Sequence, residues 1–329
     1  MDGAGLVPAP SHTQAVSDWP ALPYDEWHET RDTLHLYTQI VGSLRLALSP
    51  FEPHWMNVPL YVTGRGLTTT PMPIGARTLE AEFDFFDGML VLSSSDGRSE
   101  RRTLGGAVAD LHADVLRMLR RLDADVAFAA GPSELPDPIP FAQDRTHETY
   151  DPSQALRFWQ VLARVDAVLK EHRAGFFAKS PPVSFFWGAF DLAVVRVGSR
   201  RVTPRAGAGT IERFGGTAEQ ICAGWWPGDA RYGGPAFYAY AWPKPTGVER
   251  SSIQPAGAAW DTTSGEFLLP YPVVVASPDP RAAILDFLRS TYDAGARLLG
   301  WPDDLTRFEV PGRPRRKARS SAASARSAR

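Results

Sequence analysis

Two Asp-Gly pairs, Asp87-Gly88 and Asp96-Gly97, interrupt a β-rich stretch and constrain the fold more than any other feature of the sequence. Such pairs favour tight hairpin turns, in which both residues take positive φ angles. Residues 79–86 alternate between apolar and polar side chains, as in a half-buried strand, and residues 89–94 and 101–104 continue the pattern. The sequence therefore predicts a run of consecutive antiparallel strands.

These strands lie between helices, and the same order of elements occurs twice. Because a parallel sheet needs a helix between successive strands, runs of strands favour an α+β fold. We expect two similar halves, each a helix, antiparallel strands and a helix, and an internal duplication in which Trp55 aligns with Trp187, Leu60 with Leu192 and Val62 with Val194. Helical periodicity or capping predicts helices over 24–48, 108–122, 151–175 and 280–299. The predicted strands outside the hairpins are 58–68, 125–130, 183–197, 221–226, 236–242, 258–260, 266–269 and 273–275.

Composition divides the chain into five segments. We expect a flexible leader over 1–18, a first α+β half over 19–131, a proline-rich connector over 132–150, a second α+β half over 151–302 and a basic disordered tail over 303–329. Removing the basic tail leaves an acidic body, which does not attract nucleic acid or anionic lipid. Nucleic acid or an acidic partner is therefore expected only through the tail, whose other interpretation is a solvated low-complexity end.

Cysteine content and hydropathy bear on the cellular compartment. Cys222 is the single cysteine, so no internal disulfide forms. No apolar run reaches the ~20 residues that cross a bilayer, and the N-terminus lacks the features of a secretory signal. We expect a cytoplasmic protein without a membrane partner; the sequence does not indicate its oligomeric state.

A polar stripe on the first predicted helix is the candidate metal site. His28, Asp32 and His35, continued by Gln39, recur at helical spacing and share one face. Two imidazoles and a carboxylate suit a divalent metal or a general base. The alternative is the solvated side of an amphipathic helix, and no zinc motif is present.

Charged residues among aromatic ones form the candidate ligand site. Arg65 lies between two glycines, which leave its guanidinium free for a carboxylate or phosphate. Asp191 lies within an aromatic strand, and we expect it to pair with Lys179 or Arg196 if it is buried. The structural alternatives are a β-bulge, core packing and an ion pair. The candidate ligand-binding residues are His54, Trp55, Arg65, Lys179, Trp187, Asp191, Arg196, Trp225 and Trp226.

Several segments resemble a bacterial domain-of-unknown-function family, family 5996. They are 19–23 (WPALP), 33–36 (TLHL), 38–42 (TQIVG), 58–62 (VPLYV), 65–68 (RGLT), 137–141 (DPIPF), 185–188 (FFWG), 190–193 (FDLA) and 235–240 (PAFYAY). The family has no established activity, so the resemblance implies no catalytic residues and no cofactor.

The sequence leaves the function unassigned among three hypotheses. The first is a small-molecule binding protein or an uncharacterised enzyme, with an anionic or polar-aromatic ligand held between the halves. The second is a metal-assisted enzyme that uses the polar face of the first helix. The third is an interaction module with a basic tail. No nucleophile elbow is present, and no histidine follows His172, which argues against covalent hydrolysis.

Overall fold

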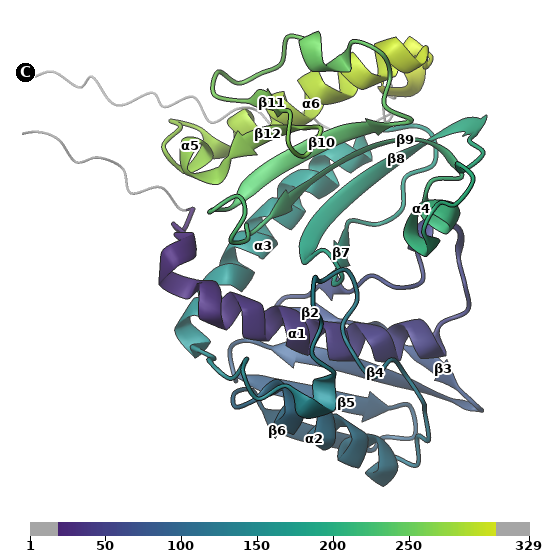
Figure 1. Ribbon diagram of the computed structural model, residues 1–329, viewed down its shortest axis with the longest axis vertical. Helices are drawn as coiled ribbons and strands as arrows, with labels where there is room; N and C mark the ends of the chain where they lie inside the picture. Colours follow the sequence, from purple (N-terminus) through teal and green to yellow (C-terminus); the bar gives the residue numbers. More distant parts are fainter. Residues whose placement is uncertain (1–18, 307–329) are drawn as a thin grey trace, which may run out of the picture.

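The computed structural model describes residues 19–306, which form two antiparallel sheets and their helices (Figure 1). The α+β prediction is confirmed. The predicted leader and the part of the predicted tail beyond Thr306 lie outside the described residues. No helix within residues 19–306 combines the length and the apolar character needed to cross a membrane.

The first half contains α1 (Tyr24–Leu48), a meander of short strands and α2 (Val108–Arg121). Its sheet has the order β1-β2-β4-β5-β6, with β3 paired to β4. Both Asp-Gly hairpins form, but only Gly88 (φ 62°) and Gly97 (φ 90°) have the left-handed conformation; the preceding aspartates do not. The strands are β1 (Tyr61–Val62), β2 (Gly66–Thr68), β3 (Met72–Ile74), β4 (Arg77–Asp84), β5 (Met89–Ser94) and β6 (Ser99–Thr103).

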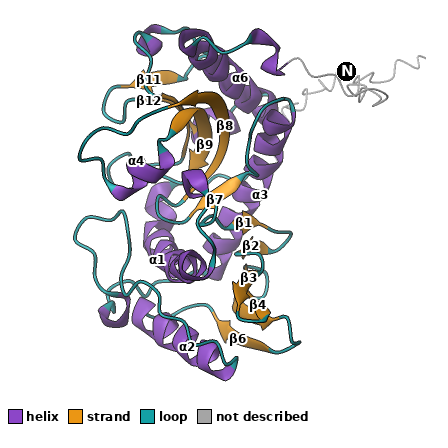
Figure 2. Cartoon of the chain, turned by 90° about the vertical axis from the view of Figure 1, so that its right-hand side faces the viewer, coloured by secondary structure: helices purple, strands orange, loops and turns teal. Residues whose placement is uncertain are grey.

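The second half begins with α3 (Pro152–Ala174), whose N-terminal amides donate to the Asp151 carboxylate, as expected of an aspartate N-cap. Its sheet has the order β11-β12-β10-β9-β8-β7. Figure 2 shows that β8 and β9 curve strongly. The remaining elements are β7 (Ser184–Phe186), β8 (Asp191–Arg201), α4 (Thr210–Gly215), β9 (Ala218–Trp226), β10 (Ala236–Trp242), β11 (Ala259–Asp261), β12 (Glu266–Pro270), α5 (Tyr271–Val275) and α6 (Pro280–Leu299). Short 3₁₀ turns lie at η1 (Pro53–Trp55), η2 (Phe141–Gln143), η3 (Val248–Arg250) and η4 (Asp303–Thr306).

Four predicted strands differ from the structure. Residues 58–68 contain the β1–β2 hairpin and residues 183–197 contain β7 and the first part of β8, so each of these predicted single strands is two antiparallel strands joined by a turn. The other two predicted segments form no strand. Residues 125–130 alternate like a strand, but no strand pairs with them; Phe128 instead packs on His112 of α2. Val273–Val275 belong to the short helix α5, which follows Pro270 and has Pro272 in its first turn, where a missing amide is tolerated.

The two halves are joined by a backbone bridge and by α1. The Leu60 amide donates to the Phe185 carbonyl oxygen (2.9 Å), and the Phe185 amide donates back (2.8 Å), which links the two sheets at one residue pair. Helix α1 lies between the sheets (Figure 1). The Trp187 indole packs so closely on α1 that a Cβ at Gly42 would lie 2.2 Å from its ring. One hydrophobic core therefore extends through both halves. The internal duplication remains a prediction.

Candidate functional site

Half of the polar stripe of α1 is buried. The second half covers His35 and the connector covers Gln39, whereas His28 is exposed and Asp32 is half-buried. His35 is 3% exposed, and its Nε2 lies 3.0 Å from the carbonyl oxygens of both Trp187 and Gly188. Since both carbonyls are acceptors, Nε2 carries the proton and donates to them; the Gln39 side-chain nitrogen Nε2 is a third neighbour, 3.1 Å away. Burial, reinforced by the Arg31 charge, lowers the pKa of His35 to about 3, so its ring is neutral at physiological pH. His35 thus fastens α1 to the β7–β8 turn.

The three candidate metal ligands point to different surroundings. His28 is exposed, and Asp32 accepts from Arg31 (Nη1 to Oδ1, 2.6 Å). Within residues 19–306, no three His, Cys, Asp or Glu side chains are grouped so that they could hold a metal ion.

The candidate ligand residues of the first half have local partners. Both His54 and Trp55 have left-handed backbones (φ 62° and 59°) and contact carbonyl oxygens of α4. His54 Nδ1 lies 2.9 Å from the Gly215 carbonyl oxygen, and Trp55 Nε1 donates to the Ile211 carbonyl oxygen (3.1 Å). They therefore hold α4 of the second half against the first half. Arg65 is exposed at the β1–β2 hairpin.

Arg65 forms ion pairs with the neighbouring β4–β5 hairpin. Its Nε lies 2.6 Å from Asp84 Oδ2, and its Nη2 lies 3.0 Å from Asp87 Oδ2. The structure does not bring Arg65 together with the candidate residues of the second half.

Arg196 and Asp191 lie on opposite faces of the second sheet, so the predicted pairing between them is wrong. Arg196 lies on the helix-covered face, where its guanidinium is 4.3 Å from the Tyr292 ring centre and Nη2 donates to the His172 carbonyl oxygen (2.5 Å). Lys179 is exposed beside β8 and forms a backbone bridge with Val197. The predicted pair with Lys179 is likewise absent, since no ion pair joins Asp191 to a basic residue within 19–306.

The three candidate tryptophans Trp187, Trp225 and Trp226 also lie in different parts of the structure. Trp225 is fully buried on the helix-covered face, near Phe158 and Tyr271. Trp226 is half-buried and contacts Tyr232. Trp187 is buried at the junction of the halves, where its Nε1 donates to the Val58 carbonyl oxygen (2.9 Å).

The face of the second sheet opposite to α3 and α6 carries a cluster of polar and aromatic side chains. Strand alternation sends Phe237 and Ala239 into the main core and Tyr238 and Tyr240 to this second face. The two tyrosine rings stack with their centres 6.4 Å apart. Cross-strand register places Cys222 beside Tyr240. We call Asp191, Cys222, Tyr238, Tyr240 and Glu266 the sheet-face cluster.

A glycine leaves room for the central hydrogen bond of the sheet-face cluster, which joins Tyr238 to Asp191. The Tyr238 hydroxyl, on β10, reaches across β9 to donate a short hydrogen bond to Asp191 Oδ2 on β8. It passes over Gly224, where a Cβ would lie 2.5 Å from the Tyr238 hydroxyl oxygen. Asp191 is placed by the β7–β8 turn that His35 holds, so α1 positions this carboxylate indirectly.

Two carboxyl groups of the cluster titrate near neutral pH. Burial raises the pKa of Asp191 to about 7. The hydrogen bond from Tyr238 lowers this pKa, and the negative charges of Glu134 and Glu266 raise it further. Burial and the Asp261 charge raise the pKa of Glu266 to about 7. Such carboxyls exchange protons readily at physiological pH, and perturbed carboxyls gather at functional sites. Tyr238, Tyr240 and Glu266 remain partly exposed to solvent.

Cys222 is expected to be unreactive in the folded protein. It is 4% exposed, and burial together with the Asp191 charge raises the pKa of its thiol to about 12, which removes the thiolate that reacts. We expect no labelling by a disulfide reagent at pH 8, and one thiol labelled per chain in denaturing urea. Rapid labelling without denaturant would contradict this description of the face.

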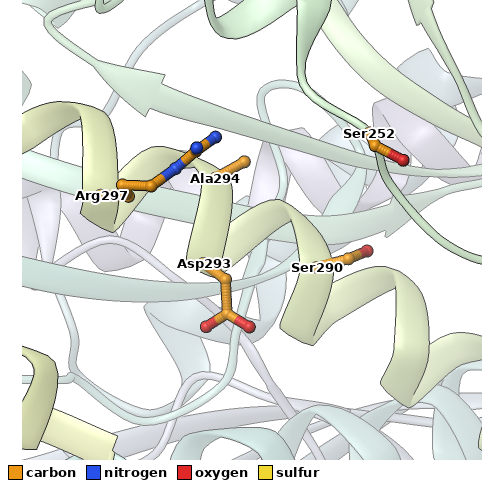
Figure 3. Close-up of a pocket in the computed structure, with 5 residues that line it drawn as sticks. All are labelled: Ser252, Ser290, Asp293, Ala294 and Arg297. Atoms are coloured by element: carbon orange, nitrogen blue, oxygen red, sulfur yellow. The ribbon is translucent and has the colours of Figure 1, made fainter.

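A separate pocket lies between α6 and the loop that contains Ser252. It has a volume of about 280 Å³ and is lined by Ser252, Ser290, Asp293, Ala294 and Arg297 (Figure 3). The Ser290 hydroxyl donates to the Asp286 carbonyl oxygen (2.7 Å) and accepts from the Gln254 amide (2.9 Å). This serine is thereby committed to holding the neighbouring loop on α6.

The sequence matches a protein family of unknown function. The model of the family described as "Family of unknown function (DUF5996)" matches residues 19–308. Searches of curated proteins and of solved structures gave no match. Because the match covers most of the sequence, including both sheets and all the helices described above, the chain belongs to the DUF5996 family of unknown function.

Proposed function

We propose that the protein binds a small polar-aromatic molecule on the sheet-face cluster, next to the junction of the two halves. The observation that carries this proposal is the Asp191–Tyr238 contact across Gly224, in a face where two carboxyls titrate near neutral pH. Stacked tyrosine rings offer a surface to a planar ligand, and the carboxyls offer hydrogen-bond acceptors. The same carboxyls suit the general acid and base of an enzyme.

The charge of the cluster favours a neutral or cationic ligand over an anionic one. Asp191 and Glu266 interact electrostatically with each other, and Glu134 of the connector adds a third carboxyl nearby. An anionic ligand would be repelled by each of these groups when they are ionised. Arg65 and Arg196, which would attract an anion, are both engaged elsewhere. The sequence suggested an anionic or a polar-aromatic ligand. The negative charge of the cluster supports the polar-aromatic ligand.

Three probes of one shape and different charge test the proposal. Benzamidine, benzamide and benzoate carry charges of +1, 0 and −1 on the same ring, and their binding is measured by calorimetry on the full chain. We expect benzamidine to bind about ten-fold more tightly than benzoate, and more tightly at pH 8 than at pH 6, because ionised Asp191 attracts the cation.

Asp191→Asn should reduce the preference for benzamidine to about two-fold or less. The matched control is Asp286→Asn, which removes an exposed carboxylate from α6 and should leave the preference unchanged. Tighter binding of benzoate, or a preference that Asp191→Asn does not alter, would refute the proposal.

A further inference from the structure

The pocket between α6 and the loop that contains Ser252 shares no residue with the sheet-face cluster. Its volume of about 280 Å³ is room for about nine water molecules. Ala294 forms the apolar part of its lining, and the other lining residues, Ser252, Ser290, Asp293 and Arg297, are polar (Figure 3). The size and the lining of this pocket therefore suit a small polar molecule.

The loop wall of this pocket is attached at both ends. At one end, the Gln254 amide donates to the Ser290 hydroxyl oxygen (2.9 Å), and this hydroxyl donates to the Asp286 carbonyl oxygen (2.7 Å). At the other end, Val248 of η3 is buried in the main core. Ser252, which is exposed, lies between these two attachments. The wall is therefore preorganised, which lowers the entropic cost of binding a ligand.

Two opposite charges on α6 line the pocket without pairing. Asp293 and Arg297 are four residues apart, a spacing at which an acidic and a basic side chain of a helix are neighbours and attract each other. At the same spacing on α3, the Lys170 ammonium lies 2.6 Å from the Asp166 carboxylate. The side chains of Asp293 and Arg297 are instead turned apart (Figure 3), and neither forms an ion pair within residues 19–306. A carboxylate and a guanidinium are therefore both available to a ligand in the pocket.

The charges of the pocket select a molecule that carries both signs. The planar Arg297 guanidinium suits a carboxylate, and the Asp293 carboxylate suits an ammonium group with its N–H donors. A simple anion would be repelled by Asp293 and a simple cation by Arg297, whereas a zwitterion is attracted by both side chains. Ala294 offers an apolar contact only to a small side chain. We infer that this pocket binds a small α-amino acid, with its carboxylate on Arg297 and its ammonium group on Asp293.

Alanine, lactate and alaninamide test the two ligand charges one at a time, because the three molecules have nearly the same shape. Lactate has a hydroxyl in place of the ammonium group, and alaninamide has a carboxamide in place of the carboxylate. In NMR titrations of the full-length protein at pH 7, alanine should bind with a Kd of roughly 1 mM and shift the amides of residues 251–254 and 290–297. Each analogue should bind about five-fold more weakly or worse. An analogue that binds as tightly as alanine, or alanine that leaves these amides unshifted, would overturn the inference.

Each of two variants should remove one of these preferences. Arg297→Gln should weaken alanine about five-fold or more, so that alaninamide binds as tightly as alanine, and Asp293→Asn should do the same for lactate. Asp286→Asn and Arg289→Gln are the matched controls, because they remove the same charges from α6 outside the pocket, and they should leave the affinity for alanine unchanged.

The four side chains are exposed, so each variant should keep the Tm within about 1 °C of that of the wild type. If Asp293→Asn still prefers alanine to lactate, or a control variant weakens alanine as much as Arg297→Gln does, the two ligand charges are not read by this pair and the inference fails. The shifted amides belong to this pocket alone, so this test and that of the sheet-face cluster succeed or fail separately.

Discussion

Gly42→Ala should destabilise the protein by about 3 kcal/mol, although alanine ordinarily stabilises a helix relative to glycine by about 1 kcal/mol. The added Cβ would lie 2.2–2.3 Å from three atoms of the Trp187 indole. The ring has little freedom to move away, because its Nε1 is bonded to the Val58 carbonyl oxygen. Urea unfolding followed by tryptophan fluorescence measures the change in the free energy of unfolding.

The control for this prediction is a double-mutant cycle with Trp187→Leu. Leucine at position 187 is smaller than tryptophan and leaves more room for the alanine side chain. In the Trp187→Leu protein, Gly42→Ala should therefore lower the free energy of unfolding much less. Gly295→Ala in α6 is a second comparison, since its Cβ would approach Ile221 and Ala241 only to 3.2–3.4 Å. A Gly42→Ala protein as stable as the wild type would show that the indole is not held against α1.

Asp191→Asn should change how stability depends on pH. The pKa of Asp191 is raised to about 7 in the folded protein, so the folded state binds more protons than the unfolded state between the two pKa values. The stabilising contribution of this group is complete below its unfolded pKa and is lost as pH rises through about 7. Between pH 5 and pH 9 the wild type should lose about 3 kcal/mol that the variant does not lose.

The comparison of the two proteins isolates Asp191 from the histidines. Burial lowers the pKa of both His35 and His172, so their contribution has the opposite sign and is lost as pH falls below about 6.5. Both histidines are present in both proteins and cancel in the difference. Urea unfolding across this pH range measures it, and parallel profiles would contradict a raised pKa at Asp191.

Local signals in the sequence predicted the four long helices, whereas the short helices α4 and α5 were missed. Helix α1 spans the predicted 24–48 and α6 the predicted 280–299, because apolar periodicity and terminal prolines are properties of the segments themselves. The two Asp-Gly signals predicted the β4–β5 and β5–β6 hairpins of the first half, whereas the β1–β2 and β7–β8 hairpins were predicted as single strands. Residues 125–130 failed because alternation shows only that a segment could pair, whereas a strand also needs an available edge.

The candidate site was predictable only in part, because its contacts depend on cross-strand register. Asp191 was a candidate from the sequence, but its partner Tyr238 lies two strands away and is reached over Gly224. The alternation of Tyr238 and Tyr240 with Phe237 and Ala239 was the signal that could have indicated a second, polar face. The burial of His35 could not be predicted from the surrounding sequence either, because Trp187 and Gly188, which cover it, belong to the second half.

The position of α1 also has a consequence for folding during synthesis. This helix is made early, yet Trp187 and Phe185, which cover it and join the sheets, are made much later. At about 5–20 residues per second, the ribosome needs on the order of 10–30 s to reach them. Throughout that interval the face of α1 that carries His35 and Gly42 stays uncovered, so the first half cannot complete its packing until the second half emerges.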